Sequence, residues 1–419
     1  MSALWRLALA SAWNRRLSLG LTLLAVVLAS TLLLSVERIR QAARDGFAQS
    51  VSGTDLVVGA RTSPVQLVLY SVFRLGEATN NLSWDSYQKI AVDPAIAWSV
   101  PLALGDSHRG YPVLGTTPAY FEHYRYGDRQ PLRLAAGQVF AGLFDAVLGA
   151  EVAQRLGYRI GDQITLTHGD GGLAGMDHDD KPFTVVGILA PTGTPVDRTV
   201  HVGLAAIEAI HLDWVGGAPL PGFSIGAEVV QKFDLTPKSI TAFLVGLHQR
   251  VEVFRLQRKI NGFAGEPLLA VLPGVALDQL WQTVAVVEQA LQAVSWLVLA
   301  VGLAGLMATM LAGLNERRRE MAILRSLGAG PRHLLALLLF ESAIVSLLGA
   351  LLGLALVSLL ALAGDGLFSR FGLAALPLAL SAREMQLLGL VLVCGTLVGL
   401  LPAWRAYRLS LADGLTPRS

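Results

Sequence analysis

The chain has 419 residues, of which 53% are hydrophobic and 15% are charged. This is too apolar for an ordinary soluble protein and too polar for membrane spans alone, so we expect a membrane protein with a large water-exposed part. The net charge is only +2, and the arginines of the chain cluster beside apolar runs. That placement indicates membrane orientation and argues against a nucleic-acid partner. With Cys394 as the single cysteine, no intramolecular disulfide can form.

The N-terminal region predicts an interfacial helix followed by a first span. Residues 1–16 carry tryptophan and leucine at helical spacing, which suits a short cytoplasmic helix lying along the inner interface. Residues 17–36 contain no charge and can cross the ~30 Å of hydrocarbon in a bilayer. A secretory signal peptide would have a shorter apolar core and a small-residue cleavage site, and none is evident before Glu37. We therefore predict an uncleaved span, with Arg15 and Arg16 on the cytoplasmic side.

Residues 37–284 have mixed polarity and no uncharged stretch long enough to span, so we predict one large extracytoplasmic α+β domain with two lobes. Its early part offers strands at 55–59 and 96–104 and a helix at 83–91 with Ser83 as N-cap. In the middle, residues 146–189 predict a helix that leads into two strands.

The end of this domain predicts a strand–helix–strand unit, with strands at 239–248 and 268–272 around a helix at 251–259. This unit and the early strands are expected to build the membrane-proximal lobe together.

Three further apolar runs predict spans at 285–315, 333–363 and 385–404. A short periplasmic loop, 364–384, precedes the last span, and a cytoplasmic tail, 405–419, follows it. Lysine and arginine gather on the side of the two termini and of the loop between the second and third spans. The positive-inside rule therefore places both termini in the cytoplasm and the large domain outside.

The loop between the second and third spans, 316–332, reads ERRREMAILRSLGAGPR. Apolar residues recur in it at roughly i, i+3 and i+6, which predicts a short amphipathic helix, and Gly328 with the following Gly and Pro ends it. An ordinary basic loop that obeys the positive-inside rule is the simpler interpretation.

The order of residues within this loop resembles the coupling helix of FtsX-like ABC transporter permeases. The stretch LGAEVAQRLGYRIGDQITL followed by FTVVGIL is similar to the periplasmic core domain of the MacB-type members of that family. In such permeases the coupling helix docks in a groove of the cytoplasmic ATPase. The resemblance therefore implies that ATPase coupling is carried by Glu316, Arg317, Glu320, Met321, Ile323, Leu324, Arg325, Leu327 and Gly328.

The 419 residues contain no phosphate-cradling G-x-x-x-x-G-K-[ST] motif, so the chain is not expected to be the ATPase itself. They also contain no G-x-S-x-G, H-E-x-x-H or paired-cysteine motif, so we expect no enzyme activity and no directly bound cofactor. The resemblance implies that ATP is used by a separate ABC ATP-binding subunit, present in two copies. The resemblance implies a multi-pass permease of the bacterial inner membrane, paired with itself as a homodimer or with a paralogous permease. Its movements would serve export, extraction or handling of a periplasmic or membrane substrate, with a periplasmic protein or lipoprotein as a further partner.

An alternative from another class is a transmembrane transducer that transports nothing and switches a periplasmic partner such as a cell-wall hydrolase. The size of the two-lobed domain favours the transporter.

Glu341 is an acidic residue about seven positions inside the third predicted span. Intramembrane carboxylates are candidates for function. A structural or coupling role close to Arg332 is the simpler interpretation, because no second intramembrane acid or base is apparent to complete a proton relay.

Histidine and aspartate gather in the stretch HGDGGLAGMDHDDK at 168–181. Histidine and carboxylate side chains are zinc ligands. The sequence therefore offers His168, His178, Asp177 and Asp179 as candidate metal ligands. A solvated glycine-rich loop between two strands explains the same stretch without a metal.

Overall fold

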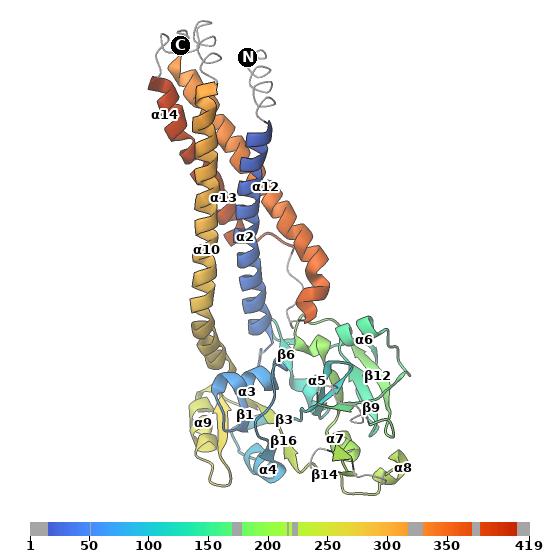
Figure 1. The fold of residues 1–419 in the computed structure, drawn as a ribbon. Helices are drawn as coiled ribbons and strands as arrows, with labels where there is room; N and C mark the ends of the chain where they lie inside the picture. Colours follow the sequence, from blue (N-terminus) through green and yellow to red (C-terminus); the bar gives the residue numbers. More distant parts are fainter. Residues whose placement is uncertain are drawn as a thin grey trace. The chain divides into compact units, whose positions relative to one another are not determined.

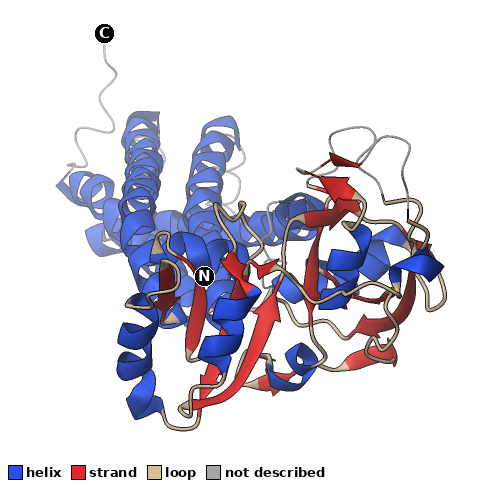
Figure 2. Ribbon diagram, turned by 90° about the horizontal axis from the view of Figure 1, so that it is seen from below, coloured by secondary structure: helices blue, strands red, loops and turns tan. Residues whose placement is uncertain are grey.

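In the computed structural model the described residues are 16–50, 52–169, 178–215, 218–219, 225–316, 330–370 and 378–408. The chain divides into two compact units: a helical unit of Met1–Ala43 with Ala285–Ser419, and a mixed unit of Arg44–Val284. Strands occur only in the mixed unit of the described chain (Figures 1 and 2). The predicted fold class, four apolar helices with a large α/β domain inserted between the first and the second, is confirmed.

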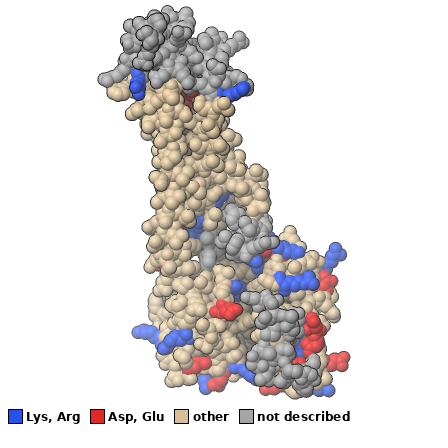
Figure 3. All heavy atoms as spheres, viewed as in Figure 1, with Lys and Arg blue, Asp and Glu red and all other residues tan. Residues whose placement is uncertain are grey.

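The helical unit is formed by long apolar helices that run side by side (Figure 1). Within the described chain four stretches are long and apolar enough to cross a membrane: Arg16–Ala42, Pro273–Leu314, Arg332–Gly364 and Ala382–Arg405. Figure 3 shows few charged side chains along these helices, whereas lysine, arginine and acidic residues are spread over the mixed unit. The helices themselves are α2 (Arg16–Gln49), α10 (Pro273–Glu316), α12 (Pro331–Arg370), α13 (Ala382–Val398) and α14 (Leu400–Arg408).

Local sequence explains where the last span begins. Ser381 is the N-cap of α13: its hydroxyl accepts a hydrogen bond from the backbone N–H of Glu384, and the Glu384 carboxylate accepts one from the backbone N–H of Ser381. This reciprocal capping box satisfies two N–H groups that the helix itself leaves unpaired.

The first lobe of the mixed unit is a four-stranded antiparallel sheet of order β18-β1-β17-β3. Its strands come from both ends of the insertion, as predicted, and helices pack beside it. They are β1 (Leu56–Ala60), β3 (Ile96–Leu102), β17 (Ala242–Leu247), β18 (Leu268–Val271), with α3 (Pro64–Ser71), α4 (Trp84–Ala91), α9 (Val253–Asn261), the 3-10 helix η2 (Arg250–Glu252) and the small pair β2 (Leu82–Ser83) and β16 (Ser239–Ile240).

The predicted helix at 83–91 and its cap are confirmed. The Ser83 hydroxyl accepts a hydrogen bond from the backbone N–H of Ser86, and Asp85 lies in the first turn of α4. Both features favour the N-terminus of a helix, the first by satisfying an unpaired donor and the second by complementing the helix dipole.

The second lobe is an eight-stranded mixed sheet, ordered β10-β12-β9-β13-β5-β4-β11, with β8 also paired to β12. The burial of Phe183–Leu189 alternates strictly along the strand, so one face of β12 lies in the core. The strands are β4 (Asp106–His108), β5 (Tyr111–Thr116), β8 (Leu134–Gly137), β9 (Asp145–Leu148), β10 (Gln163–Ile164), β11 (Thr167–His168), β12 (Phe183–Leu189) and β13 (Val200–Gly203).

Short helices and hairpins complete this lobe. They are α5 (Ala119–His123), α6 (Ala150–Leu156), α7 (Leu204–Ile210), α8 (Ala227–Val230), the 3-10 helix η1 (Pro195–Arg198), and the strand pairs β6 (Arg125–Tyr126) with β7 (Gln130–Pro131) and β14 (Trp214–Val215) with β15 (Ala218–Pro219).

The helix predicted within 146–189 and the two strands after it are confirmed by α6, β10 and β12. The first residues of that stretch are not helical: Ala146 to Leu148 belong to β9, fully buried between β12 and β13, and α6 begins only at Ala150. A short apolar run fits a buried strand as well as a helix, and pairing on both edges decides for the strand. Gly157 then ends α6 with a positive φ of 73°, a conformation that glycine adopts without strain.

Candidate functional site

The predicted coupling segment lies between α10, which ends at Glu316, and α12, which begins at Pro331. Residues 317–329 are outside the described part of the chain. The docking face of Met321, Ile323, Leu324 and Leu327, and the roles of the neighbouring charged residues, therefore stay predictions. The interfacial helix at 1–16 falls almost wholly outside the described residues as well, and so does most of the tail 405–419.

Glu341 lies on α12, where its side chain is partly buried. Its predicted role at the junction with the coupling segment stays a prediction.

The helical unit contains a buried ion pair between the first and last spans, which the sequence analysis did not anticipate. Arg38 Nε donates to Glu384 Oε1 over 2.6 Å, and both side chains are 2% exposed. Arg38 Nη1 also donates to the Ser358 hydroxyl of α12 at 3.1 Å. One guanidinium on α2 therefore contacts two other helices of the unit.

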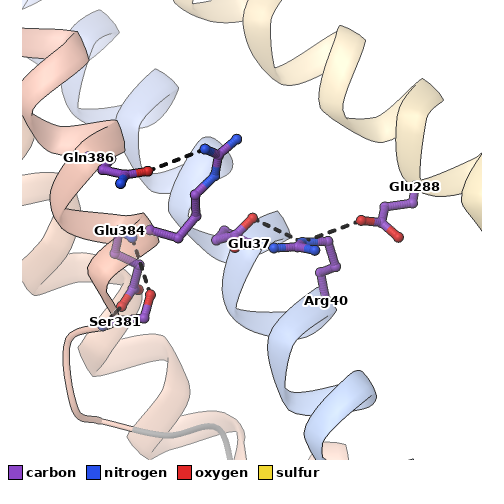
Figure 4. Close-up of polar contacts among 7 residues, drawn as sticks. Glu37, Arg40, Glu288, Ser381, Glu384 and Gln386 are labelled. Carbon is purple, nitrogen blue, oxygen red and sulfur yellow. Dashed lines mark hydrogen bonds and ion pairs between the residues drawn. The ribbon is translucent and has the colours of Figure 1, made fainter.

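A second pair lies two residues further along α2 (Figure 4). Arg40 Nε donates to Glu37 Oε2 at 3.0 Å and lies 3.3 Å from Glu288 Oε1 on α10. We call Arg38, Arg40, Glu288 and Glu384 the polar clamp, because they connect the first span to the second and the fourth.

Small residues set the spacing of the same helices. Two pairs of glycines with GxxxG spacing pack against neighbouring helices: Gly349 with Gly353 on α12, and Gly395 on α13 with Gly399 at its C-cap. A Cβ added at Gly353 would lie 2.7 Å from Ser30 Cβ of α2, and one added at Gly395 would lie 1.9 Å from Ser346 Oγ of α12. Such contacts allow close backbone approach between membrane helices.

The mixed unit contains a cluster of histidine and carboxylate side chains that sheet register creates. Strands β4 and β11 pair antiparallel with His168 opposite Asp106. His168 Nδ1 lies 3.0 Å from Asp106 Oδ1. The two residues are 62 positions apart in sequence and become neighbours only when these strands pair.

Two more histidines reach the same point from other elements. His211 follows the last turn of α7, and His178 follows β11, held by a hydrogen bond from its backbone N–H to Leu166 O at 2.9 Å. One ligand atom from each of Asp106, His168, His178 and His211 lies within 4.8 Å of all the others. We call these four residues the histidine cluster.

The electrostatics of the histidine cluster favour an ionised carboxylate. Burial opposes ionisation of Asp106, but hydrogen bonds with His168 and His211 outweigh it and lower its pKa to about 2. Burial also opposes the charge on His211, yet its contacts with Asp106 leave its pKa raised. Burial, with smaller contributions from nearby positive groups, lowers the pKa of His178 to about 4, so this ring is neutral at pH 7.

Lys181 and Trp214 border the histidine cluster. The Lys181 ammonium is fully buried and donates to Asp213 Oδ2 at 2.9 Å and to Asp180 Oδ2 at 2.8 Å. Its charge is thus offset by two carboxylates. The Trp214 ring contacts three imidazoles, with the closest centroid distance, 4.4 Å, to His178.

The structure brings together only part of the predicted metal-ligand set. His168 and His178 do meet, while Asp179 is exposed in the turn after His178 and is not among the four. Asp177 lies outside the described residues. Asp106 and His211 are not among the predicted ligands, and nothing local marks Asp106, whose place depends on sheet pairing.

Two other buried histidines have separate structural roles. His108 lies 2.6 Å from Thr165 O through Nδ1 and 3.0 Å from the Tyr158 hydroxyl through Nε2. His201 is fully buried between aromatic rings, and its Nδ1 lies 3.2 Å from Val147 O.

The two units define a class: a multi-pass membrane protein with a large α/β domain between its first and second spans. The family described as MacB-like periplasmic core domain matches residues 19–217, and the one described as FtsX-like permease C-terminal matches residues 293–411. The chain is an FtsX/MacB-type permease.

Individual relatives agree with this family. A macrolide export ATP-binding/permease protein MacB from Azoarcus sp. is 26% identical over 404 residues, which cover 93% of this chain and 56% of that protein. The lipoprotein-releasing system transmembrane protein LolC of Neisseria meningitidis is 23% identical over 284 residues, or 63% of this chain and 59% of that protein. The chain spans about half the length of the curated relatives it matches.

Among solved structures, the periplasmic region of MacB from Actinobacillus actinomycetemcomitans matches 56% of this chain and 97% of its own, at 10% identity and a TM-score of 0.35.

Proposed function

We propose that this chain is the membrane subunit of an ABC transporter that converts ATP hydrolysis on a separate ATP-binding subunit into movement of its large outer domain. The observation that carries the proposal is the combination of both family matches, over residues 19–217 and 293–411, in one chain whose α/β domain is inserted between two long apolar helices. The relatives named above, a macrolide export ATP-binding/permease protein and the transmembrane protein of a lipoprotein-releasing system, support this proposal.

The route of coupling begins at the charged loop 316–332. This loop joins α10 to α12 directly, so a displacement of the loop reaches both helices. In sequence, α2 leads into the mixed unit and α10 leads out of it. The Arg40–Glu288 contact connects these two helices. We infer that α2 and α10 move together and deliver the displacement to the inserted domain, as rigid elements packed side by side can do.

Assembly and placement follow from the same proposal. We place the chain in the bacterial inner membrane with both termini cytoplasmic and the mixed unit periplasmic, because arginines gather at the loop 316–332 and at the terminal segments. Two permease chains, identical or paralogous, would pair with two ATP-binding subunits. The substrate class is an exported or extracted periplasmic or membrane molecule, handed to a periplasmic protein or lipoprotein.

The test uses the full chain together with its ATP-binding subunit in lipid nanodiscs. Leu324→Asp places a charge on the apolar face that would dock on the ATPase, where an unpaired buried charge is costly. We expect this variant to reach the membrane but to lose the stimulation of ATP hydrolysis by the permease and the transport phenotype. Leu324→Met keeps the apolar contact and is the matched control.

Wild-type coupling in Leu324→Asp would contradict the docking face. Full ATPase coupling without any transported molecule, but with activation of a periplasmic enzyme, would instead favour the transducer.

A further inference from the structure

We propose that the histidine cluster of Asp106, His168, His178 and His211 is a binding site for a divalent cation of the zinc class, held entirely within the α/β domain. This inference goes beyond transport coupling and does not depend on it. The residues come from four separate segments, β4, β11, the stretch after β11 and the end of α7.

The first observation in favour of a metal site is the spacing of three ligand atoms. His168 Nδ1 lies 3.0 Å from Asp106 Oδ1 and 3.1 Å from His211 Nε2, and His211 Nε2 lies 3.4 Å from Asp106 Oδ1. Zinc bonds to nitrogen and oxygen are about 2.0–2.1 Å long, so the edges of a tetrahedron of such ligands measure about 3.3 Å. The three atoms therefore form a triangle with the dimensions of one face of a zinc coordination tetrahedron.

The second observation is the tautomer of His211, which leaves Nε2 free to bind a metal. Its Nδ1 lies 2.8 Å from the backbone carbonyl of Ile207, which can only accept, so Nδ1 bears the proton. In the neutral ring, Nε2 then presents a lone pair to the Asp106 carboxylate. That lone pair faces Asp106 Oδ1 at 3.4 Å, so a cation bound between them would be ligated by both and would replace the proton that links them when no metal is bound. A ligating histidine whose other nitrogen donates to a backbone carbonyl is a common arrangement around bound metals.

The third observation concerns His178, which would be the fourth ligand. Its side chain is 1% exposed, and neither ring nitrogen has a hydrogen-bond partner among the described residues. A buried imidazole without a partner is costly, and such groups call for an explanation. Because its ligand atom lies within 4.8 Å of the other three, a cation at their centre would provide the missing partner.

The donor set selects the class of ion. Three imidazoles and one carboxylate suit zinc and related divalent transition metals, while magnesium and calcium prefer sites built of oxygen. Four protein ligands make a closed site of the kind that stabilises structure. His168 and His211 keep 34% and 24% of their side chains exposed, so an ion can reach the site from solvent.

The binding test uses the full chain, purified in detergent with an affinity tag that contains no histidine. After treatment with EDTA and removal of the chelator, ZnCl2 is titrated calorimetrically, and bound metal is counted by mass spectrometry. CoCl2 serves as a second probe, because tetrahedral cobalt absorbs visible light strongly. We expect one ion per chain, an intense cobalt spectrum, and a change in fluorescence from Trp214 on binding.

Asp106→Asn and His178→Gln are the test variants, and His248→Gln, which removes an exposed histidine of the same unit, is the matched control. We expect zinc affinity to fall at least 100-fold in each test variant and to stay unchanged in the control. Circular dichroism verifies that each variant is folded. If a test variant fails to fold, the cobalt spectrum of the wild-type chain decides whether the site is tetrahedral, since octahedral cobalt absorbs only weakly.

Three results would overturn the proposal: no saturable zinc binding to the folded wild-type chain, a weak octahedral cobalt spectrum, or wild-type affinity in folded Asp106→Asn. Any of them would leave the cluster as a proton-sharing network. ATPase coupling is measured separately through Leu324→Asp, so loss of the metal proposal and loss of the transporter proposal remain distinguishable.

Discussion

Arg38 Nε and Glu384 Oε1 lie 2.6 Å apart with both side chains 2% exposed, although 346 positions separate the residues in sequence. The pair joins the first span to the start of the last. Glu384 also caps its own helix, because its other oxygen accepts a hydrogen bond from the backbone N–H of Ser381 at 2.9 Å. The ion pair thereby fixes the start of the last span to α2, while the same carboxylate caps its own helix.

Breaking this pair is expected to destabilise the helical unit. Arg38→Met or Glu384→Leu leaves one buried charge without its partner, which costs about 3–5 kcal/mol. The double variant replaces both charges by apolar groups and should recover most of that loss. Thermal unfolding of the full chain in detergent, followed by tryptophan fluorescence, measures the difference.

The exposed pair Lys89–Asp85 provides the control for this prediction, because its side chains are 62% and 71% exposed. Lys89→Ala should change stability by less than about 1 kcal/mol. Equal effects of Lys89→Ala and Arg38→Met would contradict the importance of burial at the polar clamp.

Helix spacing is expected to depend on Gly395. A methyl group there would lie 1.9 Å from Ser346 Oγ, so Gly395→Ala forces α12 and α13 apart and should cost about 1–3 kcal/mol. Gly389 lies on the same helix with no atom within 4 Å of an added Cβ, and Gly389→Ala should be neutral or slightly stabilising. Thermal midpoints in detergent compare the two. Similar losses in both variants would point to glycine flexibility instead of helix contact.

Metal removal is expected to lower the stability of the mixed unit. A ligand that binds only the folded state stabilises it by about 2.7 kcal/mol when its free concentration is 100 times its dissociation constant. Zinc should therefore raise the thermal midpoint of the wild-type chain, and EDTA should reverse the shift. Asp106→Asn should show neither change, and a zinc-dependent shift of the same size in that variant would argue against binding at this cluster.

Acid is expected to destabilise the mixed unit through His201. Burial, helped by the nearby charge of Arg74, lowers the pKa of His201 to about 3 from 6.5 in the unfolded chain. Between these values the unfolded state binds more protons, so this contribution is full above pH 6.5 and is lost as pH falls toward 3. Between pH 7 and pH 5 the loss amounts to about 2 kcal/mol.

The measurement is hydrogen exchange of strand β13 in the full chain at pH 7 and pH 5, corrected for the intrinsic rates. His201→Gln removes the titrating group and should show a smaller loss of protection on acidification, whereas the exposed His248→Gln should match the wild type. An unchanged acid response in folded His201→Gln would show that other groups govern it.

Features set by contiguous residues were predictable from the sequence. Apolar runs identify the four spanning helices because crossing hydrocarbon requires about 20 apolar residues in a row. Ser83 identifies the start of α4 because a cap acts within one turn of its own helix. The family resemblance at 316–329 likewise depends on adjacent residues alone.

Features that join distant segments were decided only by the tertiary structure. Ala146–Leu148 became a strand because β12 and β13 pair with it on both edges, which no local pattern records. Asp106 meets His168 through the register of β4 and β11, and Arg38 meets Glu384 through helix packing. A side chain contributes the same chemistry wherever it stands, but its partner is chosen by backbone pairing and packing, which depend on the whole chain.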